Sequence, residues 1–420
     1  MTNPNSDVVR IGVVDGDGIG PEIVPVAVEI ASAAAQRAGL TVEWVRLAMG
    51  QSAIAADGDP LPQKTIDALD ELDCWILGPH DSAGYPAEFR SGLTPGAIIR
   101  KRYGLFANLR PAWAYPGVPA VADDIDVLIV RENSEGLYAD RNMALGSGEF
   151  MPTQDVALAV GLITRAASER IAKVAFEQAR RRRKHVTVVH KANVLTMTTG
   201  LFREACFDVA RDYPDVVVDE QHVDAMAALL VRRAGDFDVV VTENLFGDIL
   251  SDLAAELAGS LGLAASINAS TDKAMAQAAH GAAPDIAGQD RANPVAIIES
   301  TAMLFDWWTQ RFDDERGSRA AALMRSALGE TLQAGASTPD LGGNLGTTAF
   351  GVATSKNLLV TAPGDMILMP MPRTSPDDGG LDEENPTPWL VEVHRRTSPA
   401  LRSGLYSDAG RRLGGCGGLV

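Results

Sequence analysis

Short apolar runs alternate with helical segments along most of this 420-residue chain. Three such runs, at residues 8–14, 42–47 and 74–77, are apolar or β-branched and have the length of a strand. The segments between them, 23–38 and 63–69, carry apolar residues at a spacing of three to four, which is typical of helices that bury one face. Strands that alternate with helices predict a largely parallel sheet flanked by helices.

The composition is that of an ordinary globular protein. With 46% hydrophobic and 22% charged residues, the chain fits neither a disordered nor a fibrous class, and its length favours two domains or one large α/β unit with insertions. The amino terminus has no apolar segment behind basic residues, and no stretch approaches the uncharged length that spans a membrane, so we expect a cytoplasmic protein. Cys74, Cys206 and Cys416 are odd in number and widely separated, which argues against a disulfide framework or a CxxC metal site.

Acidic residues outnumber basic residues by 55 to 37, which gives a net charge of −18. General attraction to nucleic acid or to an anionic membrane is therefore disfavoured. The basic cluster 180–184 follows a long helix predicted over 156–180, and it is typical of a solvated helix end whose cations complement the helix dipole. An anionic substrate must then be captured locally, by a few arginines in a crevice.

Two carboxylates follow a predicted buried strand in the second half of the chain. Residues 237–242 form a short β-branched run, which predicts a parallel strand that leads to a crevice at its carboxyl end. If the segment after Gly247 is helical, Asp248 and Asp252 lie one turn apart on one face and can share a hard divalent cation. For an isolated pair, an exposed helix face is the better interpretation. The surrounding motifs favour the metal site.

Seven motifs relate these segments to one enzyme family. Over about residues 9–360 the chain resembles the β-decarboxylating dehydrogenases, the family of isocitrate, 3-isopropylmalate, homoisocitrate and tartrate/D-malate dehydrogenases. The motifs occur in the family order and are GDGIGPE (16–22), NLRP (108–111), VRENSEGLY (130–138), HKANVL (190–195), VDAM (223–226), ENLFGDILSD (243–252) and HGAAPDIAG (280–288). The first motif alone is weak, whereas the ordered set is specific.

The resemblance implies a two-domain, isopropylmalate-dehydrogenase-like α/β fold with a central, mostly parallel sheet flanked by helices, different from the usual Rossmann arrangement. The expected larger domain comprises residues 1–102 and 265–360 and holds the NAD site. The expected smaller domain, 103–264, holds the dimer interface and the catalytic and metal residues. Residues 361–420 are rich in Pro, Gly, Asp and Arg, which predicts a loosely ordered tail.

The resemblance also assigns the metal ligands. Asp248 and Asp252 match two ligands of the family, and Asp224 matches a third that the family takes from the partner subunit. All-oxygen ligation suits Mg²⁺ or Mn²⁺ and disfavours Zn²⁺. We therefore expect a homodimer with shared active sites.

The hydroxy di- or tricarboxylate substrate requires cationic partners. Arg100, Arg110 and Arg131 match the three substrate arginines of the family, and a guanidinium fork suits a carboxylate better than lysine does. Thr94 and Asn193 match further substrate positions. Each of these arginines, taken alone, is more often a surface residue.

The proton steps of the family reaction are assigned to two further residues. Lys191 matches the base, and its pKa must be lowered by burial or by a nearby cation if it is to accept a proton near neutral pH. Tyr138 matches the acid. The alternatives are a snorkelling lysine and a core tyrosine with a satisfied hydroxyl.

The cofactor prediction depends on Asp285, which aligns with the acid that accepts hydrogen bonds from the adenosine ribose in NAD-using members. Members that use the phosphorylated cofactor carry lysine followed by tyrosine there, whereas this chain has Asp285 and Ile286. A carboxylate repels a 2′-phosphate, so NAD is expected. The other positions that match cofactor contacts are Gly78, His280, Gly281, Asn244 and Asn293.

The segment 91–99, which leads into Arg100, governs the choice of substrate in the family. Thr94 supplies the hydroxyl of isocitrate enzymes, Ala97 stands where homoisocitrate enzymes tend to have arginine, and Glu135 is more like isocitrate members than isopropylmalate members. The sequence thus predicts NAD- and Mg²⁺/Mn²⁺-dependent oxidative decarboxylation of a 3-substituted malate. Isocitrate ranks ahead of 3-isopropylmalate, and tartrate/D-malate is third. The alternative is a non-catalytic regulatory subunit of an isocitrate dehydrogenase, but such subunits usually lose a metal carboxylate, the tyrosine or the lysine, and this chain retains all of them.

Overall fold

The computed structural model describes residues 8–90, 92–138, 143 and 148–360. The chain divides after Thr374 into two units, and every described residue belongs to the first. The predicted tail at 361–420 lies outside the described residues. Among the described helices, none is long and apolar enough to cross a membrane.

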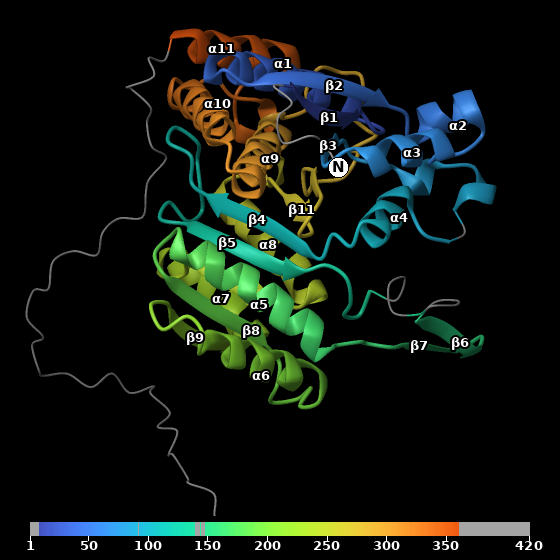
Figure 1. The fold of residues 1–420 in the computed structure, drawn as a ribbon, viewed down its shortest axis with the longest axis vertical. Helices are drawn as coiled ribbons and strands as arrows, with labels where there is room; N and C mark the ends of the chain where they lie inside the picture. The colour runs from blue at the N-terminus through green and yellow to red at the C-terminus, as the bar shows by residue number, and fades with distance from the viewer. Residues whose placement is uncertain (1–7, 91, 139–142, 144–147, 361–420) are drawn as a thin grey trace, which may run out of the picture. The chain divides into compact units, whose positions relative to one another are not determined.

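Ten strands form one central sheet, in the order β2-β1-β3-β12-β11-β4-β5-β10-β8-β9 (Figure 1). Their bounds are β1 (Val8–Val14), β2 (Thr41–Leu47), β3 (Cys74–Leu77), β4 (Ala107–Trp113), β5 (Asp126–Glu132), β8 (His185–His190), β9 (Val217–His222), β10 (Val239–Thr242), β11 (Ile267–Ala269) and β12 (Ala274–Ala276). Most neighbouring strands are parallel, whereas β4 pairs antiparallel with both β5 and β11, and β11 pairs antiparallel with β12. The predicted α/β fold with a mostly parallel sheet is confirmed.

Helices cover both faces of this sheet (Figure 1). Their bounds are α1 (Gly20–Ala38), α2 (Gln51–Asp57), α3 (Gln63–Glu71), α4 (Pro95–Arg102), α5 (Arg165–Arg180), α6 (Thr198–Ala210), α7 (Val223–Arg233), α8 (Asn244–Ala258), α9 (Val295–Phe312), α10 (Glu315–Gln333) and α11 (Thr347–Val360). One core joins β1, β11 and β12 to α1, α9 and α10. Successive side chains of β5 point to opposite faces of the sheet. On one face they pack with α5 and α6 in a second core, and on the other face they pack with α7 and α8 in a third core. The division into two domains stays a prediction.

The prediction of one helix over 156–180 is wrong in its first part. Residues 156–159 form β7, which pairs antiparallel with β6 (Glu149–Thr153) in a separate two-stranded hairpin. The helix α5 begins only at Arg165, where the Thr164 hydroxyl caps it by accepting a hydrogen bond from the Ala167 amide at 3.2 Å. The apolar residues of β7 are exposed, so no core contact selects between strand and helix there.

A buried ion-pair network connects α9 and α10. The Arg325 guanidinium donates to Glu299 at 2.7 Å and pairs with Asp306 at 2.7 Å. Glu299 is only 1% exposed, and one of its carboxylate oxygens, Oε2, has no hydrogen-bond partner among the described residues. Burial therefore raises the pKa of Glu299 to about 7, although Arg325 opposes this shift.

This raised pKa predicts that the difference in unfolding free energy between the wild type and a variant without the Glu299 carboxyl group depends on pH. In the unfolded chain Glu299 ionises near 4.5, whereas the folded chain holds the proton until about pH 7. Protonated Glu299 therefore adds to the free energy of unfolding below pH 4.5, and this contribution is lost as the pH rises to 7. The loss is at most roughly 3 kcal/mol. The variant Glu299→Gln, which does not titrate, should gain stability relative to the wild type between pH 5 and 8. Urea unfolding measures this gap, with the exposed Glu315→Gln as control. A gap that does not change with pH would contradict the assignment.

Candidate active site

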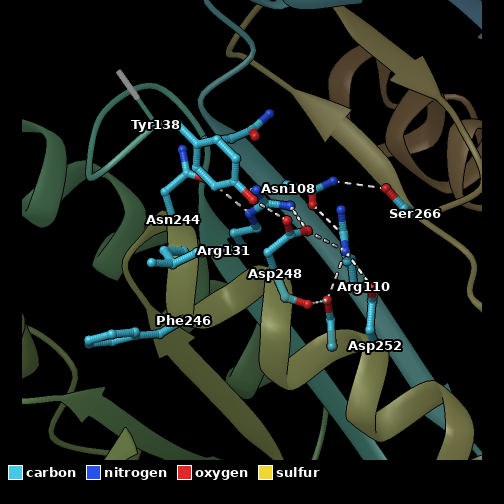
Figure 2. A network of polar contacts seen from close by, with 12 residues as sticks. Asn108, Arg110, Arg131, Tyr138, Asn244, Phe246, Asp248, Asp252 and Ser266 are labelled. Carbon is cyan, nitrogen blue, oxygen red and sulfur yellow. Dashed lines mark hydrogen bonds and ion pairs between the residues drawn. The ribbon is translucent and has the colours of Figure 1, made fainter. Parts of the chain in front are cut away.

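Four charged side chains meet where β4 and β5 approach α8 (Figure 2). Arg110 of β4 places its Nη1 3.1 Å from Oδ1 of Asp248 and 3.3 Å from Oδ1 of Asp252. Arg131 of β5 donates to Oδ1 of Asp248 at 2.5 Å. The cluster combines two guanidinium groups with two carboxylates, and both carboxylates come from a single helix.

Local structure explains why these groups meet. The strand β10 ends at Thr242, and the Glu243 carboxylate then caps α8 by accepting hydrogen bonds from the amides of Leu245 and Phe246. Asp248 and Asp252 therefore lie one turn apart on the helix, as the spacing predicts. Gly247 leaves room for Arg131, because a Cβ at this position would lie 2.6 Å from the Cγ of that arginine.

The electrostatics of the cluster keep Asp248 ionised. Burial alone would raise the pKa of Asp248, but Arg131, Arg110 and a hydrogen bond from Tyr138 together hold it below its usual value of 3.8. Burial raises the pKa of Asp252, with Arg110 opposing the shift. Burial and the neighbouring Arg131 lower the pKa of Arg110 to about 10, so this guanidinium remains charged at neutral pH. The site thus presents an ionised carboxylate beside a desolvated cation.

Tyr138 and Asn244 complete the arrangement around Arg131. The Tyr138 hydroxyl donates to Oδ2 of Asp248, and the Arg131 guanidinium lies 5.4 Å from the centre of the Tyr138 ring. The Asn244 side chain is fully buried, accepts hydrogen bonds from Arg131 at 2.7 and 3.1 Å, and donates to the Glu135 carbonyl at 2.8 Å. In this structure Asn244 orients Arg131, and its predicted contact with a ligand stays a prediction.

Sequence reasoning missed two residues that hold Arg110 in place. The Nε of Arg110 donates to Asn108 at 2.7 Å, and its Nη1 donates to the Ser251 hydroxyl at 2.8 Å. Asn108 lies two residues before Arg110 on β4, so strand alternation was the signal that both side chains share a face. Ser251 is three residues after Asp248, which likewise places it on the same face of α8.

Lys191 and Asp224 lie together but not in this cluster. Lys191 follows β8, Asp224 is in the first turn of α7, and their side chains form an ion pair. The hydrogen bond from Lys191 lowers the pKa of Asp224, whose side chain is 68% exposed. Among the described residues, no three His, Cys, Asp or Glu side chains form a group that can hold a metal ion. One chain therefore brings together two of the three predicted metal ligands.

The predicted cofactor segments meet at the glycine-rich turn before α1. The Asp17 amide donates to the Pro79 carbonyl at 2.7 Å, and the Ile19 amide donates to the Ala282 carbonyl at 2.9 Å. Gly18 has a φ of +58°, and a Cβ there would lie 2.0 Å from the Ala282 carbonyl oxygen, so only glycine fits. The turn thus joins the loop after Gly78 to the loop that contains residues 280–285.

The remaining predicted cofactor residues differ in accessibility. Asp285 and Gly281 are exposed. The Nε2 of His280 is buried without a partner among the described residues, and burial lowers the pKa of this histidine. Asn293 is buried, donates to Asp340 at 2.9 Å and accepts from the Val295 amide at 3.0 Å. The roles assigned to these residues stay predictions.

The predicted substrate residues outside the cluster lie on α4 and on the loop after β8. Thr94 caps α4, because its hydroxyl accepts a hydrogen bond from the Ala97 amide at 3.3 Å. Arg100, in the last turn of α4, donates to Gln277 at 3.4 Å. Asn193 is exposed. The structure therefore shows Arg110 and Arg131 together, with Arg100 on a separate element.

Comparison with known proteins identifies relatives across nearly all of the described residues. The family model described as isocitrate/isopropylmalate dehydrogenase matches residues 10–357. The 3-isopropylmalate dehydrogenase of Sulfurisphaera tokodaii is 40% identical over 80% of this chain and 95% of its own length. The isocitrate/homoisocitrate dehydrogenase of Thermus thermophilus is 41% identical over 81% of this chain and 96% of its own length. A crystal structure of isocitrate dehydrogenase from Methylococcus capsulatus has a TM-score of 0.73 at 38% identity, and covers 83% of this chain and 99% of that one.

The geometry of the cluster predicts the effect of removing Arg131. The variant Arg131→Met removes the shorter of the two ion pairs of Asp248 and leaves the Asn244 side-chain oxygen without its donor, which should cost about 1–3 kcal/mol of unfolding free energy at pH 7. The pKa of Asp248 is lower in the folded chain than the 3.8 of the unfolded chain. The Arg131–Asp248 ion pair therefore stabilises the fold above pH 3.8, and this contribution is lost as the pH falls through the pKa of the folded chain. The gap from the wild type should therefore shrink in acid. Urea unfolding tests this, and the exposed Arg211→Met should change little. Equal effects of the two substitutions would refute the role of Arg131.

Proposed function

Because the chain belongs to the isocitrate/isopropylmalate dehydrogenase family, we propose that it oxidises and decarboxylates a 3-substituted malate, with NAD as hydride acceptor and Mg²⁺ or Mn²⁺ as the metal. The family and the named relatives indicate a dehydrogenase of the isocitrate/isopropylmalate type. The cluster of Arg110 and Arg131 with Asp248 and Asp252 is the observation that carries the proposal, because it offers a cation for a substrate carboxylate beside ligands for a hard metal ion.

Arg110 is the substrate-binding residue that the geometry supports best. Its Nε and Nη1 are bonded within the protein, whereas its Nη2 makes no hydrogen bond to a described residue. The bonds to Asn108 and Ser251 fix the guanidinium, so Nη2 is oriented before the substrate arrives. All three nitrogens of Arg131 donate to Asn244 or Asp248, which suits a residue that keeps the site charged and ordered.

The donor chemistry of Asp248 and Asp252 fits Mg²⁺ or Mn²⁺. Both groups are carboxylates on one helix face, and the arginines hold Asp248 in the ionised form that a hard cation requires. When bound, such a cation would polarise the 2-hydroxyl group of the substrate and then the 2-oxo group that oxidation forms at the same carbon. Tyr138, which donates to Asp248, would give a proton to the product carbon, and Lys191 would perform the opposite proton transfer.

A homodimer would supply the third carboxylate. The Lys191–Asp224 pair is solvent-accessible, and large apolar side chains are exposed near it on residues 194–197, including Met197 at 85% exposure. Further exposed apolar residues, among them Phe150 and Met151, lie on the hairpin of β6 and β7. Apolar surface of this kind is typical of an interface. We assign it to a second copy of this chain, whose Asp224 and Lys191 would enter the site.

The cofactor proposal depends on the exposed carboxylate of Asp285. Its position in the loop beside the glycine-rich turn supports a contact with the ribose hydroxyls of NAD, and its charge opposes a 2′-phosphate. The relatives named for 3-isopropylmalate and for isocitrate/homoisocitrate are almost equally similar, at 40% and 41% identity, so similarity alone does not select the acid. Isocitrate and 3-isopropylmalate are therefore both proposed substrates.

An NADH assay tests the proposed activity. Purified protein with NAD and Mn²⁺ should form NADH with isocitrate or 3-isopropylmalate, and chelation of the metal should stop the reaction. Replacing NAD by NADP should lower kcat/KM by at least about tenfold, because Asp285 repels the added phosphate. Absence of NADH with isocitrate, 3-isopropylmalate, homoisocitrate, tartrate and D-malate would overturn the proposal and favour the non-catalytic subunit.

Mixed dimers test the sharing of the site. Asp224→Asn and Asp248→Asn homodimers should each lose at least about 100-fold in kcat, because each lacks a metal ligand in both sites. A heterodimer of the two variants contains one site with all its carboxylates and should recover about half of the wild-type activity. Purification with two different affinity tags isolates this species. An inactive heterodimer, or full activity in a verified monomer, would contradict the sharing.

A further inference from the structure

The face of β4 opposite the candidate active site lines a large cavity. Asn108 and Arg110 point toward α8, whereas Leu109, Pro111 and Trp113, which alternate with them, line a cavity of about 880 Å³. This volume lies in the range of small-molecule sites. Because the strand alternation separates the two places, the cavity is not part of the cluster around Asp248.

The walls of the cavity belong to two different hydrophobic cores. The helix α5 packs in one core, and α9 and α10 pack in another; Figure 1 shows α5 lying over β5 and α9 lying beyond β4. Leu109, on the floor between them, packs against both cores. An occupant would therefore contact side chains of both cores.

The interior of the cavity is largely aromatic. Trp113, Trp307 and Met303 line it with large apolar side chains. The Nε1 of Trp113 and the Oε2 of Glu299 have no hydrogen-bond partner among the described residues, but both atoms are fully buried and do not face the open part of the cavity. An occupant would therefore gain mainly from apolar contact with the two tryptophans and Met303.

Cations without partners lie on the α5 wall. The side chains of Lys173 and Arg181 are exposed and make no ion pair or hydrogen bond with a described residue, although the chain carries a net charge of −18. The other basic residues of the cavity are paired, Arg182 with Asp126, Arg311 with Asp272 and Arg325 with Glu299. Glu177, which lies one turn from both Lys173 and Arg181 and also lines the cavity, pairs with Arg180 at 3.5 Å. Two unpaired cations beside an aromatic interior are complementary to an anion with a flat apolar body.

We propose that this cavity binds a small aromatic anion whose ring lies against Trp113, Trp307 and Met303, and whose carboxylate or phosphate pairs with Lys173 and Arg181. The site is separate from the proposed catalytic activity and does not depend on it. Since β4 carries Arg110 on its other face, an occupant contacts the strand that positions this arginine.

A dye titration tests the proposal on the full chain. The probe is 8-anilinonaphthalene-1-sulfonate, which has an aromatic body, an N–H group and an anionic group and fluoresces when it is held in an apolar site. The double variant Lys173→Glu/Arg181→Glu reverses the charge of the α5 wall, and both residues are exposed, so folding should be unaffected. Ala322→Phe fills the cavity from α10. The control is Lys64→Glu, a charge reversal on the exposed face of α3.

The proposal predicts a saturable fluorescence signal that either cavity variant weakens at least about tenfold, as expected when a charge-assisted contact is lost, while Lys64→Glu leaves it unchanged. Phenylacetate and phenyl phosphate should compete for the site, and the stronger competitor identifies the anionic group. Absence of a saturable signal would overturn the proposal. So would a signal that both the charge variant and Ala322→Phe leave intact, or one that neither competitor displaces. Melting temperatures of the variants show whether a lost signal reflects unfolding.

Discussion

The pairing of Arg110 and Arg131 with Asp248 is the interaction on which the candidate site depends. A carboxylate that is two-thirds buried would normally lose its charge, but two guanidinium groups on adjacent strands keep it ionised. The arginines in turn remain in the protein interior because they have anionic and amide partners, which include Asn108 and Asn244. The same contacts therefore stabilise the site and set its charge, and they keep Asp248 in the form that can bind a cation.

The sheet explains why these groups are available together. The antiparallel pairing of β4 with β5 places Arg110 and Arg131 on neighbouring strands, and β10 delivers α8 beside them. The opposite face of β4 carries Leu109 and Trp113, which line the cavity of about 880 Å³. One short strand therefore contributes to the polar cluster on one side and to an apolar space between two cores on the other. Any ligand of that space would act on the strand that holds Arg110.

The sequence predicted those parts of the site that depend on local spacing. Asp248 and Asp252 were placed correctly relative to each other because four residues make one helical turn. The hydrogen bond between Arg110 and Ser251 joins residues far apart in the chain, so no local pattern predicts it. The error at 156–180 arose because exposed apolar residues without a core contact fit a helix as well as a strand. The three-residue strands β11 and β12 are too short to show a periodicity.

We propose that two copies of this chain assemble one metal site, with Asp248 and Asp252 from one copy and Asp224 from the other. Electron paramagnetic resonance of Mn²⁺, titrated into the purified dimer with the hydroxy acid that supports turnover, tests it most directly, because bound and free Mn²⁺ give separate signals. One Mn²⁺ ion should bind per chain. Asp224→Asn should weaken this binding at least about tenfold, although Asp248 and Asp252 are unchanged in that variant. Unaltered Mn²⁺ binding in Asp224→Asn would contradict the account.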